Sequence, residues 1–195
     1  MQERRRKRRW VIAAAAGAVV VALGLALFKP WLLFIDVRVD EQLPTVAAST
    51  VAVSPSPERT APSAGPKLPS GSPSTAPAGP IQLAEGRLIS HEHATSGTVR
   101  IVRQSGGSRV LTLENLDTSN GPDVHVWLSA ADVVEGTAGW FTAGSAEHYD
   151  LGLIKGNQGN QVYAIPDDVD LARYRSVDLW CVQFSVSFGA AQLSR

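Results

Sequence analysis

The chain begins with one long apolar run and continues, after a polar stretch, with short runs in which apolar and polar residues alternate. The apolar run, Val11 to Phe28, carries no charged side chain. At ~1.5 Å per residue it spans about 27 Å of helix, close to the thickness of a bilayer core. The pattern predicts one transmembrane helix over residues 10–30, with Trp10 and Trp31 at the two interfaces.

The alternating runs lie in residues 81–195 and predict strands. They are rich in β-branched and aromatic residues, recur at roughly 10-residue spacing and are separated by glycine or polar turns. Tight turns are expected at "SGG", residues 105–107, and at "SNGPD", residues 119–123. The pattern predicts an all-β fold, with a single antiparallel β-sandwich or barrel-like domain. The runs are "GRLISHEH", "GTVRIVRQ", "SRVLTLENL", "DVHVWLS", "HYDLGLIK", "NQVYAIP" and "SVDLWCVQFSVSF".

Residues 44–80 hold nine of the chain's twelve prolines, mixed with Ser, Ala, Thr and Gly. Such a composition buries too little apolar surface to offset chain entropy, so a disordered linker is expected. The linker follows a juxtamembrane segment, 31–43, and precedes the β domain, 81–195. We therefore expect a tether that holds the domain away from the bilayer.

The net charge of zero conceals an uneven distribution. Residues 1–9 form a basic tail, whereas the segment from residue 80 onward has eight basic and thirteen acidic side chains. A basic run beside an apolar span favours an uncleaved signal anchor in the cell membrane, with a cytoplasmic N-terminus and the C-terminal domain outside the cytoplasm. A cleaved signal peptide is the main alternative. The acidic domain offers no basic face, so no nucleic-acid partner is expected.

The only cysteine, Cys181, lies in the last run, "SVDLWCVQFSVSFGAAQL". If this run is one long strand, its alternation places Trp180, Phe184 and Phe188 on the core face and Cys181 on the weaker, more polar face. A partly accessible thiol is then expected. It cannot form a disulfide within the chain. Its options are a sulfenic acid, a mixed disulfide with a redox protein partner, a disulfide-linked homodimer, or ligation of a metal or haem.

Four histidines supply candidate metal ligands. "HEH" places His91 and His93 on one face of a strand, a spacing that can chelate copper or zinc if a third ligand comes from across the sheet. A structural interpretation, with His93 hydrogen-bonded and His91 solvated, is favoured over this metal site. The sequence requires no cofactor, and haem and copper stay open as alternatives.

Sequence motifs of conventional enzymes are absent: there is no G-x-S-x-G, no H-E-x-x-H and no glycine-rich phosphate loop. The sequence therefore predicts neither a hydrolase nor a transferase. Two functions stay open. One is a redox or electron-transfer accessory, and the other is a non-catalytic ligand-binding or adhesion module of the cell envelope.

Several motifs resemble the DM-thirteen domain family over nearly the whole of residues 81–195. They are Gly86, His93 and Gly97 in the first runs, then "ENLDTSNGPDVHVWLS", "DLGLIKGNQGNQVYAIP" and "YRSVDLWCVQFSVSFGAAQL". The last motif is the most discriminating. Leu116 departs from the family, which usually has an aromatic residue at that position. The anchored arrangement resembles a membrane-anchored bacterial type.

The resemblance implies a β-rich extracellular domain with a role in redox chemistry or electron transfer. It implies that Cys181 is the redox thiol, and that Trp180 and His93 from the family motifs complete the candidate site. The family often accompanies DOMON and cytochrome b561-type domains. Because no such segment is present in the sequence, the electron donor and acceptor are expected to be separate molecules.

Overall fold

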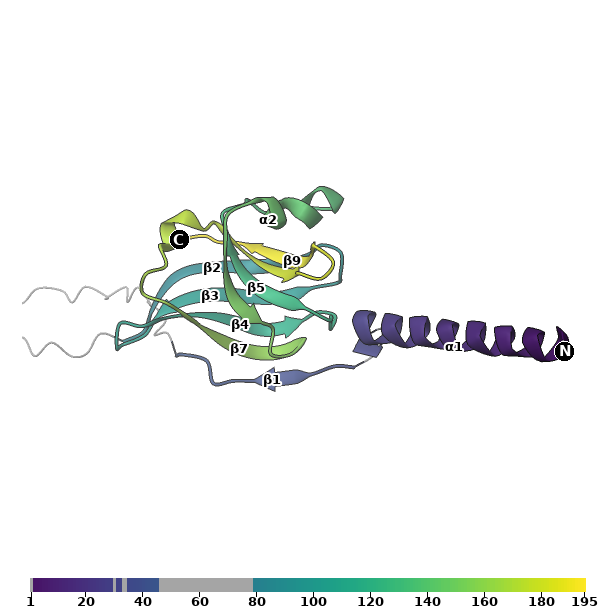
Figure 1. Cartoon of the computed structure of the whole chain (residues 1–195). Coiled ribbons are helices and arrows are strands. Elements are labelled where there is room, and N and C mark those ends of the chain that lie inside the picture. Colours follow the sequence, from purple (N-terminus) through teal and green to yellow (C-terminus); the bar gives the residue numbers. More distant parts are fainter. Residues whose placement is uncertain (1, 30, 33–34, 46–78) are drawn as a thin grey trace, which may run out of the picture.

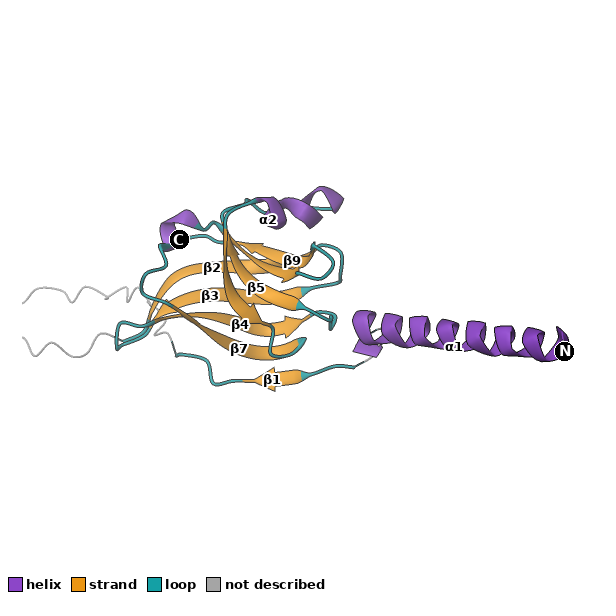
Figure 2. Cartoon of the chain, viewed as in Figure 1, coloured by secondary structure: helices purple, strands orange, loops and turns teal. Residues whose placement is uncertain are grey.

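The computed structural model describes residues 2–29, 31–32, 35–45 and 79–195, and consists of one N-terminal helix and a mostly β domain (Figure 1, Figure 2). The predicted all-β, barrel-like domain is confirmed. Both predicted tight turns connect consecutive strands. The predicted disordered linker, 44–80, falls almost entirely outside the described residues.

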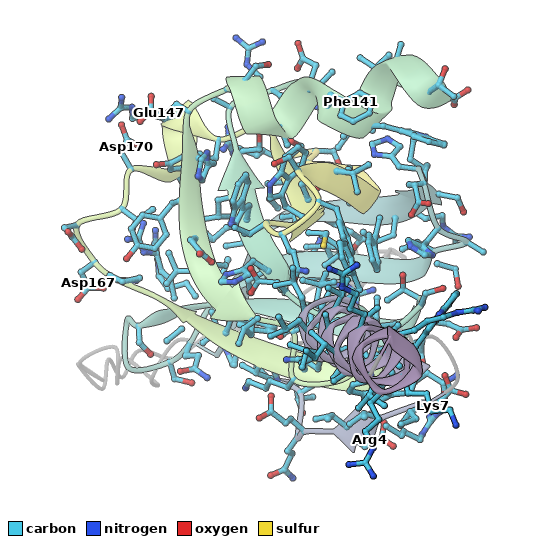
Figure 3. The ribbon with its side chains drawn as sticks, turned by 45° about the vertical axis from the view of Figure 1, so that its right-hand side comes forward. Arg4, Lys7, Phe141, Glu147, Asp167 and Asp170 are labelled. Atoms are coloured by element: carbon cyan, nitrogen blue, oxygen red, sulfur yellow. The ribbon has the colours of Figure 1, made fainter. Side chains whose placement is uncertain are left out.

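Helix α1, Gln2–Phe28, contains residues 10–28 of the predicted membrane span, 10–30. Its stretch Arg9–Phe28 is long enough and apolar enough to cross a membrane, and none of that stretch is buried within the protein. The helix extends away from the domain, with the N-terminus at its far end (Figure 1). Arg4 and Lys7 lie at that far end (Figure 3). An N-terminal helix with so many exposed apolar side chains is typical of a membrane span or a signal sequence.

The domain is one curled sheet of nine strands, in the order β1-β7-β4-β3-β2-β9-β8-β5-β6. Neighbouring strands are antiparallel except β1 and β7, which are parallel. The strands are β1 Arg38–Asp40, β2 Ile81–Ser90, β3 Ser96–Arg103, β4 Arg109–Asp117, β5 Val124–Ser129, β6 His148–Leu153, β7 Gln158–Ile165, β8 Ser176–Cys181 and β9 Val186–Gln192. Short helical segments are η2 Thr137–Phe141, α2 Thr142–Ser145 and η3 Leu171–Arg173.

The sheet changes direction along β2, which pairs with two different strands. Its residues 81–87 pair with β3, and its residues 88–90 pair with β9. Gly86 lies next to this change, where a Cβ atom would come within 2.4 Å of the carbonyl oxygen of Gln192. Glycine therefore permits the close approach that the curl requires. The core inside the curl includes Leu88, Ile101, Leu111, Leu128, Leu179 and Phe188.

Strand β1 lies in the segment for which the sequence analysis predicts only a juxtamembrane connection. Its three residues pair with residues 158–160 of β7. Two glycines make room for its backbone. A Cβ atom on Gly156 would be 2.3 Å from the carbonyl oxygen of Val37, and a Cβ atom on Gly159 would be 2.1 Å from that of Val39. The glycines of "KGNQGNQ" thus accommodate an edge strand that comes from the start of the chain.

Polar contacts hold the segment around β1 against the domain. The backbone N–H of Val37 donates to Oδ1 of Asn157 at 2.7 Å. Nζ of Lys155 lies 2.7 Å from Oε2 of Glu41, and the hydrogen bond from Lys155 lowers the pKa of Glu41. The same carboxylate accepts the N–H of Val162 at 2.6 Å. The segment is therefore an integral part of the folded domain.

The position of β1 corrects the expected role of the linker. Residues 29–37 separate α1 from β1, and a nine-residue segment reaches at most about 32 Å when fully extended. The proline-rich residues 46–78 come after β1 in the sequence. They therefore connect two strands of one sheet, and they do not separate the sheet from α1.

Candidate functional site

Strand β8 ends at Cys181, where the sequence analysis predicts one continuous strand. Residues 182–185 form a turn, and β9 begins at Val186. The turn, "VQFS", has no glycine, proline, asparagine or aspartate, and Ser185 is the only one of its residues that is common in turns. Ser185 adopts a φ of 53° within the turn. The predicted long strand is therefore wrong, and its alternation does not carry through the turn.

The hairpin reverses the predicted environment of Cys181. The side chain is 0 % exposed and belongs to the main core, beside Val186 of β9. The expectation of a partly accessible thiol on a polar face is therefore wrong. Burial raises the pKa of the thiol, whereas the backbone N–H groups of Phe184, Gln183 and Asp123 oppose that rise. In this conformation Cys181 is a protonated, sealed thiol.

Trp180 faces the opposite side of β8 from Cys181, as strand alternation requires. It packs in a separate buried cluster with Trp127 and Ala143. The Trp180 and Trp127 rings are stacked with centroids 5.2 Å apart, and the Trp127 ring stacks on His148 at 3.7 Å. Trp180 therefore packs on the outer face of the sheet, whereas the Cys181 thiol lies in the main core on the other face.

His91 and His93 follow β2 in a bend, so they do not lie on one strand face as predicted. His91 is buried. Its Nδ1 lies 2.7 Å from Oγ of Ser187, and its Nε2 lies 3.1 Å from the carbonyl oxygen of Val134. His93 packs against Phe188 with ring centroids 3.9 Å apart. The expectation that His91 is solvated is wrong, and the two imidazoles do not form the proposed chelate.

Among the described residues, no group of three or more His, Cys, Asp or Glu side chains gathers as a metal site. A copper or haem ligand set built on His91 does not fit, because both of its ring nitrogens have partners. His125 lies 2.8 Å from Asp150 and 3.2 Å from Asp123. Burial alone would lower the pKa of His125, but these two carboxylates outweigh it and raise the pKa.

His91 belongs to a buried polar network that the sequence analysis missed. Asp178, in the middle of β8, is 2 % exposed. Burial raises its pKa to about 7, and a hydrogen bond with Ser187 opposes the rise. Oδ1 of Asp178 has no hydrogen-bond partner among the described residues. The sequence feature that could have found this network is an acidic residue inside the otherwise apolar "VDLWC".

Two proton arrangements are compatible with the hydrogen bonds of this network. Because the carbonyl of Val134 only accepts, Nε2 of His91 must carry a proton. When Asp178 is protonated, Ser187 can donate to Nδ1 of His91 and accept from Asp178. When the proton is on Nδ1 instead, His91 donates to Ser187, which donates to the Asp178 carboxylate. Burial disfavours this charged arrangement, so the neutral one is favoured.

An apolar cavity of about 520 Å³ lies between the end of α1 and the domain. Its aromatic lining includes Phe28, Trp140, Phe141, Phe184 and Phe188. The rings of Phe28 and Phe184 are stacked, with centroids 5.9 Å apart. Phe141 lies on the helical segment above α1 (Figure 3). The wall of this cavity also includes Val186, the strand partner of Cys181.

One of the predicted site residues also contributes to this cavity. His93 lines it, together with Glu92, Lys29 and Asn120. Nε2 of His93 lies 2.5 Å from Oε2 of Glu92. Burial lowers the pKa of His93, and Glu92 opposes that effect. Of the three predicted site residues, Cys181 and His93 therefore lie at the end of the sheet near α1, and Trp180 faces away.

Comparison with known protein families gave a match over more than half of the chain. The profile described as "Electron transfer DM13" matches residues 87–193, which include all of the β8–β9 hairpin. No curated protein and no solved structure matched the chain.

Proposed function

Because the chain belongs to the electron-transfer DM13 family, we propose that it is a membrane-anchored electron-transfer domain that works outside the cytoplasm, with Cys181 as its redox-active residue. In this proposal α1 is the anchor, since it is apolar, exposed and preceded by basic residues. Cys181 lies within the matched residues 87–193.

The observation that carries this proposal concerns the turn 182–185, which covers the Cys181 thiol. Val182 and Phe184 in this turn are 41 % and 45 % exposed, so the turn contributes little to the core. Exposed segments with few core contacts open without unfolding of the whole domain. Opening of the turn would admit a reactant to Cys181 and remove the burial that raises its pKa.

The end of α1 contacts this cover. Nε2 of Gln183 donates to the carbonyl oxygen of Leu27 at 2.9 Å, and Phe184 stacks on Phe28. Movement at the end of the proposed membrane helix is therefore coupled to exposure of the thiol. A redox partner in the membrane or at its surface could control Cys181 through this contact.

A lone thiol needs one molecule that oxidises it and another molecule that reduces it again. Peroxide oxidises the thiol to a sulfenic acid and is itself reduced to water. Two thiols of a partner then restore the Cys181 thiol, with formation of the partner's disulfide and release of water. This cycle agrees with the expectation that the electron donor and acceptor are separate molecules.

We expect Cys181 in the full chain to react with a small thiol reagent through opening of the turn. Under native conditions its labelling rate should be nearly independent of low denaturant concentrations, and at least about tenfold above the rate set by global unfolding. Gln183→Ala, which removes the hydrogen bond to Leu27, should increase the rate further. Mass spectrometry after brief labelling measures these rates.

A second buried thiol provides the control for this measurement. Ala191 is 0 % exposed in the same core, and Ala191→Cys in a Cys181→Ala background places a thiol where no turn covers it. That thiol should label only when the whole domain unfolds. If Cys181 labels no faster than this control, and peroxide leaves it unmodified, Cys181 is a core residue and the proposal fails.

A further inference from the structure

We infer that the cavity between α1 and the domain binds the ring of a lipid-soluble quinone. The redox character of this ligand and its route from the bilayer rest on the proposed function, whereas the volume and lining of the cavity do not. The volume of about 520 Å³ is within the usual range for small-molecule sites, roughly 300–1,000 Å³. The cavity therefore has room for a substituted quinone ring and the first part of its tail.

The lining favours a flat, apolar ring over a flexible chain alone. Phe28, Phe141, Phe184, Phe188 and Trp140 all contribute to it. Aromatic side chains pack against planar rings in stacked and edge-to-face arrangements, which a saturated chain cannot reproduce. A quinone is planar and carries its two polar atoms at opposite ends of the ring.

Those two polar atoms are carbonyl oxygens, which accept hydrogen bonds. The cavity offers donors to match them. Lys29 carries an ammonium group, and Asn120 carries an amide group with two N–H bonds. One of these bonds is used by the carbonyl oxygen of Ile35, at 3.2 Å, which leaves the other for a ligand. Lys29 and Asn120 therefore supply donors for the carbonyl oxygens of a quinone ring.

The position of the cavity provides a route for a ligand that stays in the bilayer. Phe28, Lys29 and Leu32 line it, and they lie at or just after the last turn of α1. An apolar tail can therefore remain among lipids while the ring reaches the cavity. A cavity next to the bilayer offers no easier access to a water-soluble ligand.

The test uses the full chain in lipid nanodiscs and a decyl-substituted benzoquinone as the probe. We expect saturable binding of one molecule per chain by equilibrium dialysis, and no competition from decanol, which has a tail of equal length but no ring. Phe184→Glu and Phe141→Glu should each weaken binding by at least about tenfold, because each places a carboxylate at the apolar lining. Both positions are exposed, so the domain tolerates the change.

Leu153→Glu is the matched control, because Leu153 is equally exposed but lies on β6 outside the cavity. This variant should bind the quinone as the wild type does. Equal competition by decanol, absence of saturable binding, or unchanged binding in both cavity variants would each overturn the inference. Cys181→Ala should still bind the quinone. The experiment therefore distinguishes failure of the quinone inference from failure of the proposed redox role of Cys181.

Discussion

Cutting the chain at a protease site introduced within residues 46–78 should leave residues 79–195 attached to the N-terminal fragment. The reason is that β1 precedes the cut and pairs with β7. The hydrogen bond between Val37 and Asn157 and the ion pair between Glu41 and Lys155 add to this pairing. In membranes that contain the full chain, the C-terminal fragment should stay in the membrane fraction after complete cleavage.

A glycine substitution tests whether β1 is responsible. Gly156→Ala introduces a Cβ atom only 2.3 Å from the carbonyl oxygen of Val37, so β1 must move away. The cut variant should then release its C-terminal fragment. Gly106→Ala is the control, because no atom lies within 4 Å of the added Cβ. Release of the fragment from the cut wild-type chain by a simple wash would show that β1 does not hold the domain.

The second large effect is the pH dependence of stability caused by Asp178. Its pKa rises from an ordinary value of 3.8 to about 7 in the folded domain. Between these values the folded state holds a proton that the unfolded state has lost, so stability falls as pH rises. At 1.36 kcal/mol per pKa unit, the loss is at most about 4 kcal/mol, and it is complete above the folded pKa.

Asp178→Asn should remove this pH dependence, because the amide stays neutral and can still donate to Ser187. The variant should match the wild type near pH 4 and exceed its free energy of unfolding near pH 8, by up to about 4 kcal/mol. Denaturant titrations at a series of pH values measure the difference. Asp168→Asn, at an exposed position, should leave the profile unchanged. If Asp178→Asn shows the same pH profile as the wild type, Asp178 and its partners hold no such extra proton in the folded domain.

The strands of the domain could largely be predicted from the sequence, whereas the environment of the thiol could not. The seven predicted runs all contain strands of the sheet, because alternation and glycine or polar turns mark them. The last run is the exception. Its turn, "VQFS", contains Val182 and Phe184, which are typical of strands, and it has no glycine or proline. In the structure the turn includes Ser185 with a positive φ. One unrecognised turn was enough to place Cys181 on the wrong face.

The edge strand β1 was missed for a different reason. In "IDVRVD" the apolar residues Ile35, Val37 and Val39 alternate with charged ones, which is a strand pattern. Its neighbours in the sequence, the apolar helix and the proline-rich linker, suggested a connection instead. The pairing with β7 joins residues more than a hundred positions apart, and no local pattern specifies such a contact.

Strand β1 also determines where a soluble fragment of this protein can begin. A fragment that starts at Ile81 contains every residue of the family match, yet it lacks the strand that covers β7. The N–H and C=O groups of β7 that face β1 would then be unpaired at an open sheet edge, which is a common origin of aggregation. A peptide that carries residues 35–41, added to such a fragment, would restore the missing edge and keep the fragment monomeric.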